Sequence, residues 1–325
     1  MCNKILSIIA PCYNGEKYIE RFLNSIVNQT YPFIELIVIN DGSSDNTGQI
    51  LKRYESIFEK KGINFKYFFQ ENRGIGSAIN NALKKVTGDY LTWFGTDDFA
   101  LPTYAEELVN FLNLNEDYAV VRNDGYIVKE DNINHIVGKM AESNNDKHNP
   151  YLFENAILEK DFHFGYSVIR MSAFDKVNPK REIYPSRQGQ NWQLLLPIFY
   201  KYKAAFYEKP LYCVVDNIDS VSRTPHKTYE GVKSQNLEYE KILINVLNSM
   251  EIENKKKYYD MVKIKYIRRR MYVAFNFNKK DDVISEYRKL KKLKRNNFRD
   301  FSIYIRTKIP ILNKILNFVK IYRHN

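Results

Sequence analysis

The segment Tyr90-Leu91-Thr92-Trp93-Phe94-Gly95-Thr96-Asp97-Asp98 places two adjacent carboxylates directly after a short apolar run. The apolar part, 90–94, has the length and composition of a buried strand, so the two acids lie at a strand end. Carboxylates in that position are where Mg²⁺ or Mn²⁺ commonly meets a phosphate. Taken alone, such a pair before Pro102 more often belongs to a turn and a helix start, so the neighbouring sequence has to supply the evidence for a metal site.

Apolar runs alternate with helical patterns through the first hundred residues. The strand-like runs are 5–10, 34–39, 65–69 and 90–94, and the segments between them predict helices over 16–29, to about residue 61, and after Gly74. Such alternation predicts an α/β domain with a mostly parallel sheet flanked by helices. In a sheet of this kind the ligand binds beyond the carboxyl ends of the strands, and the polar clusters of this chain follow those ends.

Four of these clusters occur in an order that resembles a known family. The motifs are Ile9-Ala10-Pro11-Cys12-Tyr13-Asn14, Asn40-Asp41-Gly42-Ser43-Ser44-Asp45, the stretch from Asn72-Arg73-Gly74 to Ala78, and Thr96-Asp97-Asp98. Together they resemble the nucleotide-sugar half of the family 2 glycosyltransferases, which have the Rossmann-like GT-A fold. The similarity extends over roughly residues 4–225 and is strongest up to Pro102.

The resemblance assigns Pro11, Tyr13 and Asp41 to the nucleoside, with Asp41 accepting from the base, and Arg73 to the diphosphate. Physical chemistry agrees for Arg73, a fork-shaped donor just before a glycine turn and a helix start, although a solvated loop arginine fits the same position. Tyr13 alone would equally be a core or rim aromatic. The complete predicted nucleotide-sugar site is Pro11, Tyr13, Asn14, Asp41, Arg73, Gly74, Thr96 and Asp97.

The resemblance also implies a divalent cation, Mg²⁺ or Mn²⁺, held by Asp97 together with diphosphate oxygens and water. Family members often carry Asp-x-Asp-Asp at this motif, whereas this chain has Gly95 in the leading position. Gly74 and Gly76 lack the third glycine of a dinucleotide-binding fingerprint, and no P-loop sequence is present.

The second half of the domain is expected to bind the acceptor. The family usually has Glu-Asp where this chain has Gln190-Asn191, and that aspartate is the usual general base. An amide cannot take a proton at neutral pH, so either Asn191 only orients the acceptor or another group is the base. His163 and Asp161 are the substitutes that the sequence suggests, although a histidine among aromatics more often packs in a core. The predicted catalytic set is Asn191, Gln190, His163 and Asp98.

Charge is distributed unevenly along the chain, which carries +12 overall. Residues 255–325 hold 22 Lys/Arg and 5 Asp/Glu, against 28 and 33 in residues 1–254. We therefore predict two parts: a GT-A domain over 1–225, divided into a nucleotide-sugar half (1–102) and an acceptor half (103–225), and a basic, mainly helical region over 226–325. Within that region, 310–322 has one apolar and one basic helical face, which fits an anionic membrane surface. Packing against the domain, or a solvated charged face, explains the pattern equally well.

Composition narrows the class of protein further. The unclustered Cys2, Cys12 and Cys213 indicate a reducing compartment, and the chain shows neither a signal-peptide pattern nor a membrane-spanning run, so we expect a cytoplasmic protein. A peripheral position at the inner face of the cell membrane depends on the basic region and is one of the alternatives given for it. Nucleic-acid binding through the basic region ranks low, because no recognition motif accompanies the charge. The oligomeric state is not predicted.

The sequence predicts an inverting, metal-assisted transferase that moves a hexose or N-acetylhexosamine from a nucleoside diphosphate, UDP being favoured, to a saccharide acceptor. Lipid-linked intermediates of a bacterial surface polysaccharide are the acceptors that the family and the basic region suggest. The alternative is a nonenzymatic nucleotide- or saccharide-binding relative, which Gly95 and Asn191 motivate.

Overall fold

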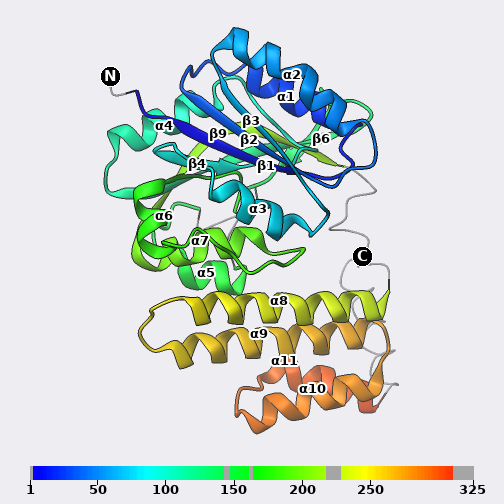
Figure 1. Ribbon diagram of the computed structural model, residues 1–325. Helices are drawn as coiled ribbons and strands as arrows, with labels where there is room; N and C mark the ends of the chain where they lie inside the picture. The colour runs from blue at the N-terminus through cyan, green and yellow to red at the C-terminus, as the bar shows by residue number, and fades with distance from the viewer. Residues whose placement is uncertain (1–2, 143–146, 161–163, 217–227, 310–325) are drawn as a thin grey trace. The chain divides into compact units, whose positions relative to one another are not determined.

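The structure is a computed structural model that describes residues 3–142, 147–160, 164–216 and 228–309 (Figure 1). The chain divides into two compact units, Met1–Asn217 and Ile218–Asn325, which we call the first and second unit. The boundary predicted after residue 225 falls in 217–227, outside the described residues.

The first unit opens with the predicted alternation of strands and helices. Its elements are β1 Leu6–Cys12, α1 Ile19–Val27, β2 Ile34–Asp41, α2 Thr47–Lys61, β3 Asn64–Gln70, α3 Ile75–Leu83 and β4 Tyr90–Trp93. All four predicted strands are confirmed within two residues at each end. The first helix is shorter than the predicted 16–29, because the chain turns before it: the carbonyl of Gly15 accepts from the amides of Tyr18 and Ile19.

The sheet has β1 at the centre of its parallel part, paired with β2 on one side and β4 on the other, while β3 extends the parallel set beyond β2. The later strands continue past β4 in the order β8, β6, β9, β5. Their bounds are β5 Phe99–Ala100, β6 Tyr118–Lys129, β7 Ile136–Lys139, β8 Val168–Arg170 and β9 Lys203–Asp216. The long β6–β9 pair is parallel and β8 is antiparallel to both of its neighbours, so most paired residues lie in parallel ladders, as expected.

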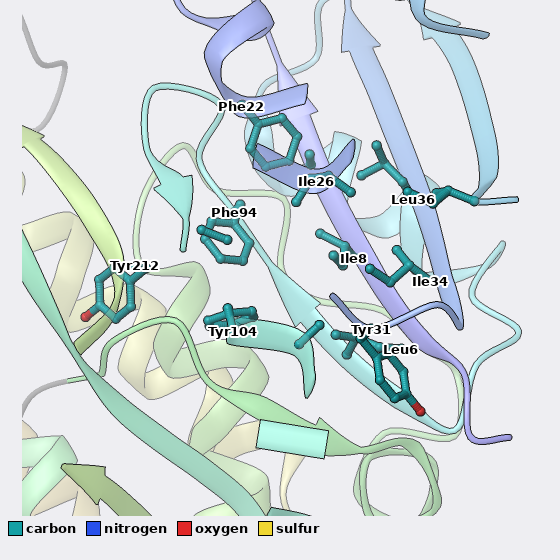
Figure 2. Close-up of a cluster of buried hydrophobic side chains, with 14 of the residues drawn as sticks. Leu6, Ile8, Phe22, Ile26, Tyr31, Ile34, Leu36, Phe94, Tyr104 and Tyr212 are labelled. Carbon is teal, nitrogen blue, oxygen red and sulfur yellow. The ribbon is translucent and has the colours of Figure 1, made fainter. Parts of the chain in front are cut away.

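The core follows from the alternation of side chains along β1. Leu6 and Ile8 point to one face, where Phe22 and Ile26 of α1 pack over them together with Leu36 of β2 (Figure 2). Full burial of an aliphatic side chain contributes roughly 1.5–3 kcal/mol, so this layer is a major source of stability. On the opposite face, α3 contacts β1 and β2. The remaining helices of the first unit are α4 Tyr104–Leu114, α5 Phe153–Leu158, α6 Met171–Val177 and α7 Gln190–Lys201.

A buried carboxylate lies inside the sheet. Glu35 of β2 is fully buried and accepts from the ammonium of Lys66 on β3 (2.5 Å), the hydroxyl of Ser7 on β1 (2.5 Å) and both the amide and hydroxyl of Thr87 (3.0 and 2.6 Å). Burial by itself would raise the pKa of Glu35, but these donors outweigh it and hold the pKa below its usual value of 4.5. The ionised carboxylate thus joins three neighbouring strands.

The second unit is helical in its described part, as predicted. It contains α8 Tyr229–Ser249, α9 Lys255–Asn276, α10 Lys280–Lys292 and α11 Phe298–Lys308, which pack around a small apolar core. Among the described helices, none has the combination of length and apolar character that a membrane crossing needs. The predicted amphipathic helix 310–322 lies outside the described residues.

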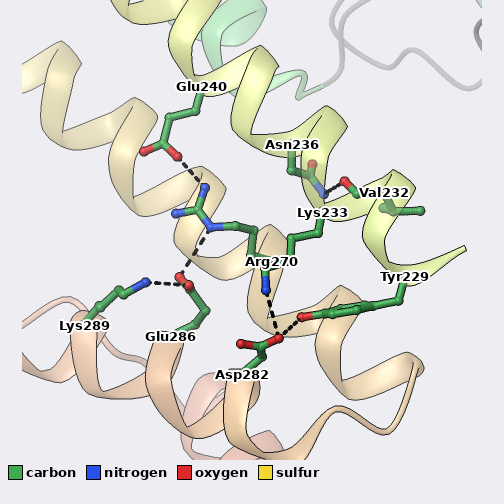
Figure 3. A network of polar contacts seen from close by, with 9 residues as sticks. All are labelled: Tyr229, Val232, Lys233, Asn236, Glu240, Arg270, Asp282, Glu286 and Lys289. Atoms are coloured by element: carbon green, nitrogen blue, oxygen red, sulfur yellow. Dashed lines mark hydrogen bonds and ion pairs between the residues drawn. The ribbon is translucent and has the colours of Figure 1, made fainter. Parts of the chain in front are cut away.

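Part of the positive charge of the second unit is paired within it. Buried Arg270 of α9 contacts Glu240 of α8 and Glu286 of α10, and Glu286 also accepts from Lys289 (Figure 3). Asp282 of α10 accepts from Tyr229 and Lys233 of α8 in the same view. These contacts hold three helices together, so not all of the basic side chains are available to a partner.

Candidate active site

The strand ends of the first unit surround a cavity of about 480 Å³. Its wall contains residues from both predicted halves, including Pro11, Trp93, Gly95, Glu159, Tyr166 and Asn191. Pro11 belongs to β1, and Trp93 is the last residue of β4. The cavity therefore lies at the carboxyl ends of parallel strands, where the alternating pattern places a ligand.

Asp41, the last residue of β2, organises one side of this region. Its buried carboxylate accepts from the amides of Arg73 (2.9 Å) and Gly74 (2.8 Å) and from the side chain of Gln70 (2.8 Å). The loop can approach so closely because Gly42 and Gly74 have positive φ, and a Cβ at Gly42 would lie 2.6 Å from the amide nitrogen of Asn72. The structure thus brings Asp41, Arg73 and Gly74 together. A carboxylate has about four acceptor positions, so Asp41 keeps capacity for one further donor.

Arg73 precedes the N-terminus of α3 and its side chain is 71% exposed, with one long ion pair of 3.9 Å to Glu71. Gly74 is the N-cap residue of α3, so Arg73 directly precedes the helix start in the sequence, while the amide of Gly76 in the first turn already donates to the carbonyl of Ser186 (3.2 Å). A helix N-terminus and an arginine together favour an anion such as a diphosphate.

Tyr13 and Asn14 follow β1 and lie on a loop that is hydrogen-bonded to the loop after β2. The amide of Asn14 donates to the hydroxyl of Ser43 (2.9 Å), and its side-chain oxygen accepts from the amide of Ser44 (2.9 Å). Tyr13 is 55% exposed on this loop, so its ring is open to a stacking partner. Asn14 has a φ of 47°, which asparagine tolerates better than most residues.

The two adjacent carboxylates after β4, those of Asp97 and Asp98, lie in different surroundings. Asp97 is half-buried, its backbone oxygen accepts from the guanidinium of Arg21 (2.5 Å), and a Cβ at Gly95 would lie 2.6 Å from one of its carboxylate oxygens. The glycine thus leaves room for the present orientation of Asp97. Thr96 is buried, and its hydroxyl contacts the sulfur of Cys12 at 3.6 Å.

The donor set of this motif fits Mg²⁺ or Mn²⁺ bound with a substrate. No cluster of three or more His, Cys, Asp or Glu that could hold a metal occurs among the residues that the structure describes. These cations commonly take one or two carboxylates and complete their shell with substrate phosphates and water. A single protein carboxylate, such as that of Asp97, therefore fits such a cation only together with phosphate oxygens and water.

Asp98, by contrast, is bound into the fold. Its carboxylate accepts from the hydroxyl of Tyr166 (2.5 Å) and from the amide of Val215 on β9 (2.9 Å). Burial, together with the neighbouring charge of Asp97, raises the pKa of Asp98 to about 7. Asp98 is not among the residues that line the cavity, its two hydrogen bonds join the motif to Tyr166 and β9, and its part in catalysis stays a prediction.

The predicted acceptor motif reaches the cavity from α7. Gly189 has positive φ at the N-cap, and Gln190 and Asn191, the first two residues of the helix, both line the cavity. The side-chain oxygen of Asn191 accepts from the indole nitrogen of Trp93 at 2.8 Å. This contact joins the predicted acceptor half to the end of β4. His163 and Asp161 lie outside the described residues.

Several cavity residues were not singled out from the sequence, among them Trp93, Tyr166 and Glu159. Trp93 lies within the opening motif, and Tyr166 lies within the segment around His163, where its ring stacks on Phe94 with centroids 4.1 Å apart. An aromatic beside a polar motif is the signal that could have identified both. Glu159 carries no local signal of this kind.

Comparison with known proteins gives a consistent result. The family model described as "Glycosyl transferase family 2" matches residues 7–177, just over half of the 325 residues. An uncharacterized glycosyltransferase of Rickettsia typhi is 39% identical over 122 residues, which are 38% of this chain and 36% of the relative. The match therefore spans little more than a third of that protein's length.

Two solved structures share the fold. S. aureus TarS in complex with UDP-GlcNAc has a TM-score of 0.57 at 18% identity and covers 90% of this chain and 91% of its own. A mannosyltransferase from Pyrobaculum calidifontis in complex with GDP-Man and Mn²⁺ has a TM-score of 0.57 at 13% identity, covering 99% of this chain and 82% of its own. The expected GT-A architecture is confirmed.

Proposed function

The chain belongs to glycosyl transferase family 2, and on that basis we propose that it transfers a sugar from a nucleoside diphosphate sugar to a hydroxyl of a saccharide acceptor. The observation that carries the proposal is the cavity at the strand ends, where Pro11 and Gly95 of the predicted donor half meet Gln190 and Asn191 of the acceptor half. A transferase needs such a junction, because the reacting atoms of donor and acceptor must be held together.

The donor is proposed to bind along the strand ends beside the cavity. Tyr13 offers an open ring for the base, and Asp41 has acceptor capacity for a base donor. Arg73 and the N-terminus of α3 would hold the diphosphate. Asp97 would hold the divalent cation, which supplies stabilisation of the charge that develops on the departing diphosphate.

Attack by the acceptor hydroxyl on the face opposite the diphosphate would invert the anomeric centre. The bond from the anomeric carbon to the phosphate oxygen breaks as the new glycosidic bond forms, and the electron pair leaves with the diphosphate. Arg73 would stabilise this leaving group, and preorganised stabilisation of developing charge is usually the largest part of such catalysis.

UDP-hexoses and UDP-N-acetylhexosamines are the donors that we favour. S. aureus TarS binds UDP-GlcNAc, but the mannosyltransferase of similar fold binds GDP-Man, so the choice of nucleotide needs a direct test. The charge of the second unit supports the further proposal that the acceptor is lipid-linked, at the inner face of the membrane, in bacterial surface glycan synthesis.

The deciding experiment measures binding and slow hydrolysis of UDP-, GDP- and dTDP-sugars with and without Mn²⁺. We expect one donor class to be hydrolysed in a metal-dependent way. Asp97→Asn should then abolish the metal-dependent part while the circular dichroism spectrum stays unchanged, because Asp97 is not a core residue. Equal turnover with chelator and with Mn²⁺ would contradict the role of the metal.

A nonenzymatic binding protein is the second candidate, and the contact between Asn191 and Trp93 favours it. That contact shows an amide used to hold the cavity wall, at the position where the family usually has a base. Tight binding of a sugar nucleotide without any turnover would support this candidate and exclude the transferase.

A further inference from the structure

The proposed transfer needs a group that takes the proton of the attacking hydroxyl. Asn191 cannot do so, since an amide has no basic lone pair at neutral pH and its oxygen already accepts from Trp93. Burial raises the pKa of Tyr166 and of Tyr212, the phenols of the cavity wall, well above the usual value, so both keep their protons. The remaining ionisable group among the described lining residues is the carboxylate of Glu159.

The backbone at Glu159 is unusual for this residue type. Glu159 directly follows α5 and has φ 52° and ψ 41°, the left-handed conformation that glycine adopts at most helix ends of this kind. A residue with a Cβ is strained there, and glycine would relieve the strain. Backbone strain of this kind clusters at functional sites, and in this chain Arg181 and Lys294 carry it as well, so the position of Glu159 in the cavity wall is the feature that distinguishes it.

The packing of α5 fixes where Glu159 lies. The indole nitrogen of Trp192 on α7 donates to the carbonyl of Ala156 on α5 at 3.0 Å, and the amide of Lys160 donates to the carbonyl of Asn155 at 3.1 Å. Trp192 is the neighbour of Asn191 in the sequence. The same helix that brings Asn191 to the cavity therefore holds the end of α5 that carries Glu159.

We propose that Glu159 is the general base, which takes the proton of the acceptor hydroxyl as its oxygen bonds to the anomeric carbon. This inference rests on the proposed function. The carbon–oxygen bond to the diphosphate breaks with its electron pair leaving on the diphosphate, and the proton passes to the Glu159 carboxylate. Glu159 is exposed, so it can release the proton to solvent before the next cycle.

The test uses the full chain with Mn²⁺ and water in place of the acceptor. Hydrolysis of UDP-glucose and UDP-N-acetylglucosamine is measured for wild type, Glu159→Gln and Glu159→Gly. We expect kcat to fall by roughly a hundredfold or more in both variants, while the Kd for UDP stays within twofold. The wild-type rate should fall toward low pH, and this acidic limb should be absent in Glu159→Gln.

Two features separate a chemical role from a structural one. Glu159→Gly should melt at the same temperature as wild type or higher, because it removes the left-handed strain, so its loss of activity cannot come from unfolding. The matched control is Glu154→Gln, on the first turn of the same helix and outside the cavity wall, which should keep wild-type hydrolysis.

The inference is overturned if both Glu159 variants hydrolyse the donor within threefold of wild type. It is also overturned if the variants lose UDP binding, because Glu159 would then shape the site, or if the acidic limb survives in Glu159→Gln and disappears in His163→Ala. Absence of wild-type turnover with every sugar nucleotide is a different result, since it removes the proposed function itself.

Discussion

Neighbouring residues of one type differ in chemistry here because their surroundings differ. Asp97 is half-buried beside a glycine that leaves it room, whereas Asp98 is buried, bonded to Tyr166 and Val215, and has its pKa raised to about 7. The sequence analysis assigned Asp97 to the metal and Asp98 to the catalytic set. It could not show that Asp98 is bonded into the fold, because Val215 is more than a hundred residues away in the chain and only the fold brings its amide to Asp98.

Arg73 is expected to recognise the diphosphate and not the nucleoside. Arg73→Ala should weaken UDP binding about tenfold, since a hydrogen bond to a charged group contributes about 1.5–3 kcal/mol and exposure of the side chain reduces this. Uridine binding should stay unchanged. Isothermal titration with both ligands measures the difference, and Arg53→Ala on α2, another exposed arginine, is the control. Equal weakening of UDP and uridine would contradict the assignment.

Asn191→Asp tests whether the active site lacks a base at the helix start. If Glu159 already takes the proton, the variant should leave donor hydrolysis unchanged or lower it, because the new carboxylate adds negative charge near the diphosphate. In the Glu159→Gln background the same change should restore part of the rate. A marked increase in donor hydrolysis when Asn191→Asp is the single change would instead show that the wild-type protein has no effective base.

At the scale of secondary structure, the strands before the site could be predicted because each is an apolar run ended by turn-forming residues. The cavity wall could not be predicted, because it is formed by pairs such as Trp93 and Asn191, which lie far apart in the sequence. Glu159 gave no signal at all: its left-handed backbone closes the end of α5, where the amide of Lys160 donates to the carbonyl of Asn155, and glutamate is not a residue type that predicts such a helix end. The motif residues Asp41, Arg73 and Gly74 lie together as the strand-end rule predicts.

Because ionised Glu35 joins three strands, we expect the free energy of unfolding to depend on pH. The pKa of Glu35 is lower in the folded state than the unfolded value near 4.5, so its contribution is present above pH 4.5 and is lost as the pH falls through the folded pKa. Glu35→Gln should cost about 3 kcal/mol of unfolding free energy at pH 7, because it leaves Lys66 without its partner.

Urea denaturation at pH 7, 5, 4 and 3 measures this difference. The gap between wild type and Glu35→Gln should shrink toward the lowest pH, where the wild-type carboxyl is protonated. Glu55→Gln, at an exposed position of α2, should show almost no gap at any pH. A gap that stays constant over the whole range would mean that the ionised form of Glu35 is not what stabilises the sheet.

At the scale of the whole molecule, the two units differ in charge and in architecture, and we expect them to differ in partner. The basic residues at the C-terminal end of α10 are the test case. Lys291, Lys292 and Lys294 are exposed and lie close together in the sequence. Each lysine near an anionic surface contributes about 1 kcal/mol to binding.

Replacing these three lysines by glutamate should weaken binding to phosphatidylserine-containing vesicles by roughly a hundredfold, and added salt should weaken the wild type in the same direction. Vesicle sedimentation measures the loss. The matched control replaces Lys52, Lys60 and Lys61, which are exposed on α2, by glutamate. It has the same net charge as the test variant. An equal loss in both triple variants would indicate a general charge effect and not a membrane-facing surface.

The chain has two tryptophans, of which Trp93 lines the cavity and Trp192 contacts a residue of its wall. Trp93 forms part of its wall, and Trp192 packs edge-on against Phe164, which also lines it, at 6.0 Å between ring centroids. Indole emission depends on the polarity and hydrogen bonding around the ring, so a molecule entering the cavity would change the fluorescence of the unlabelled protein. The protein therefore contains its own optical reporter, with which ligands could be screened before any acceptor is known.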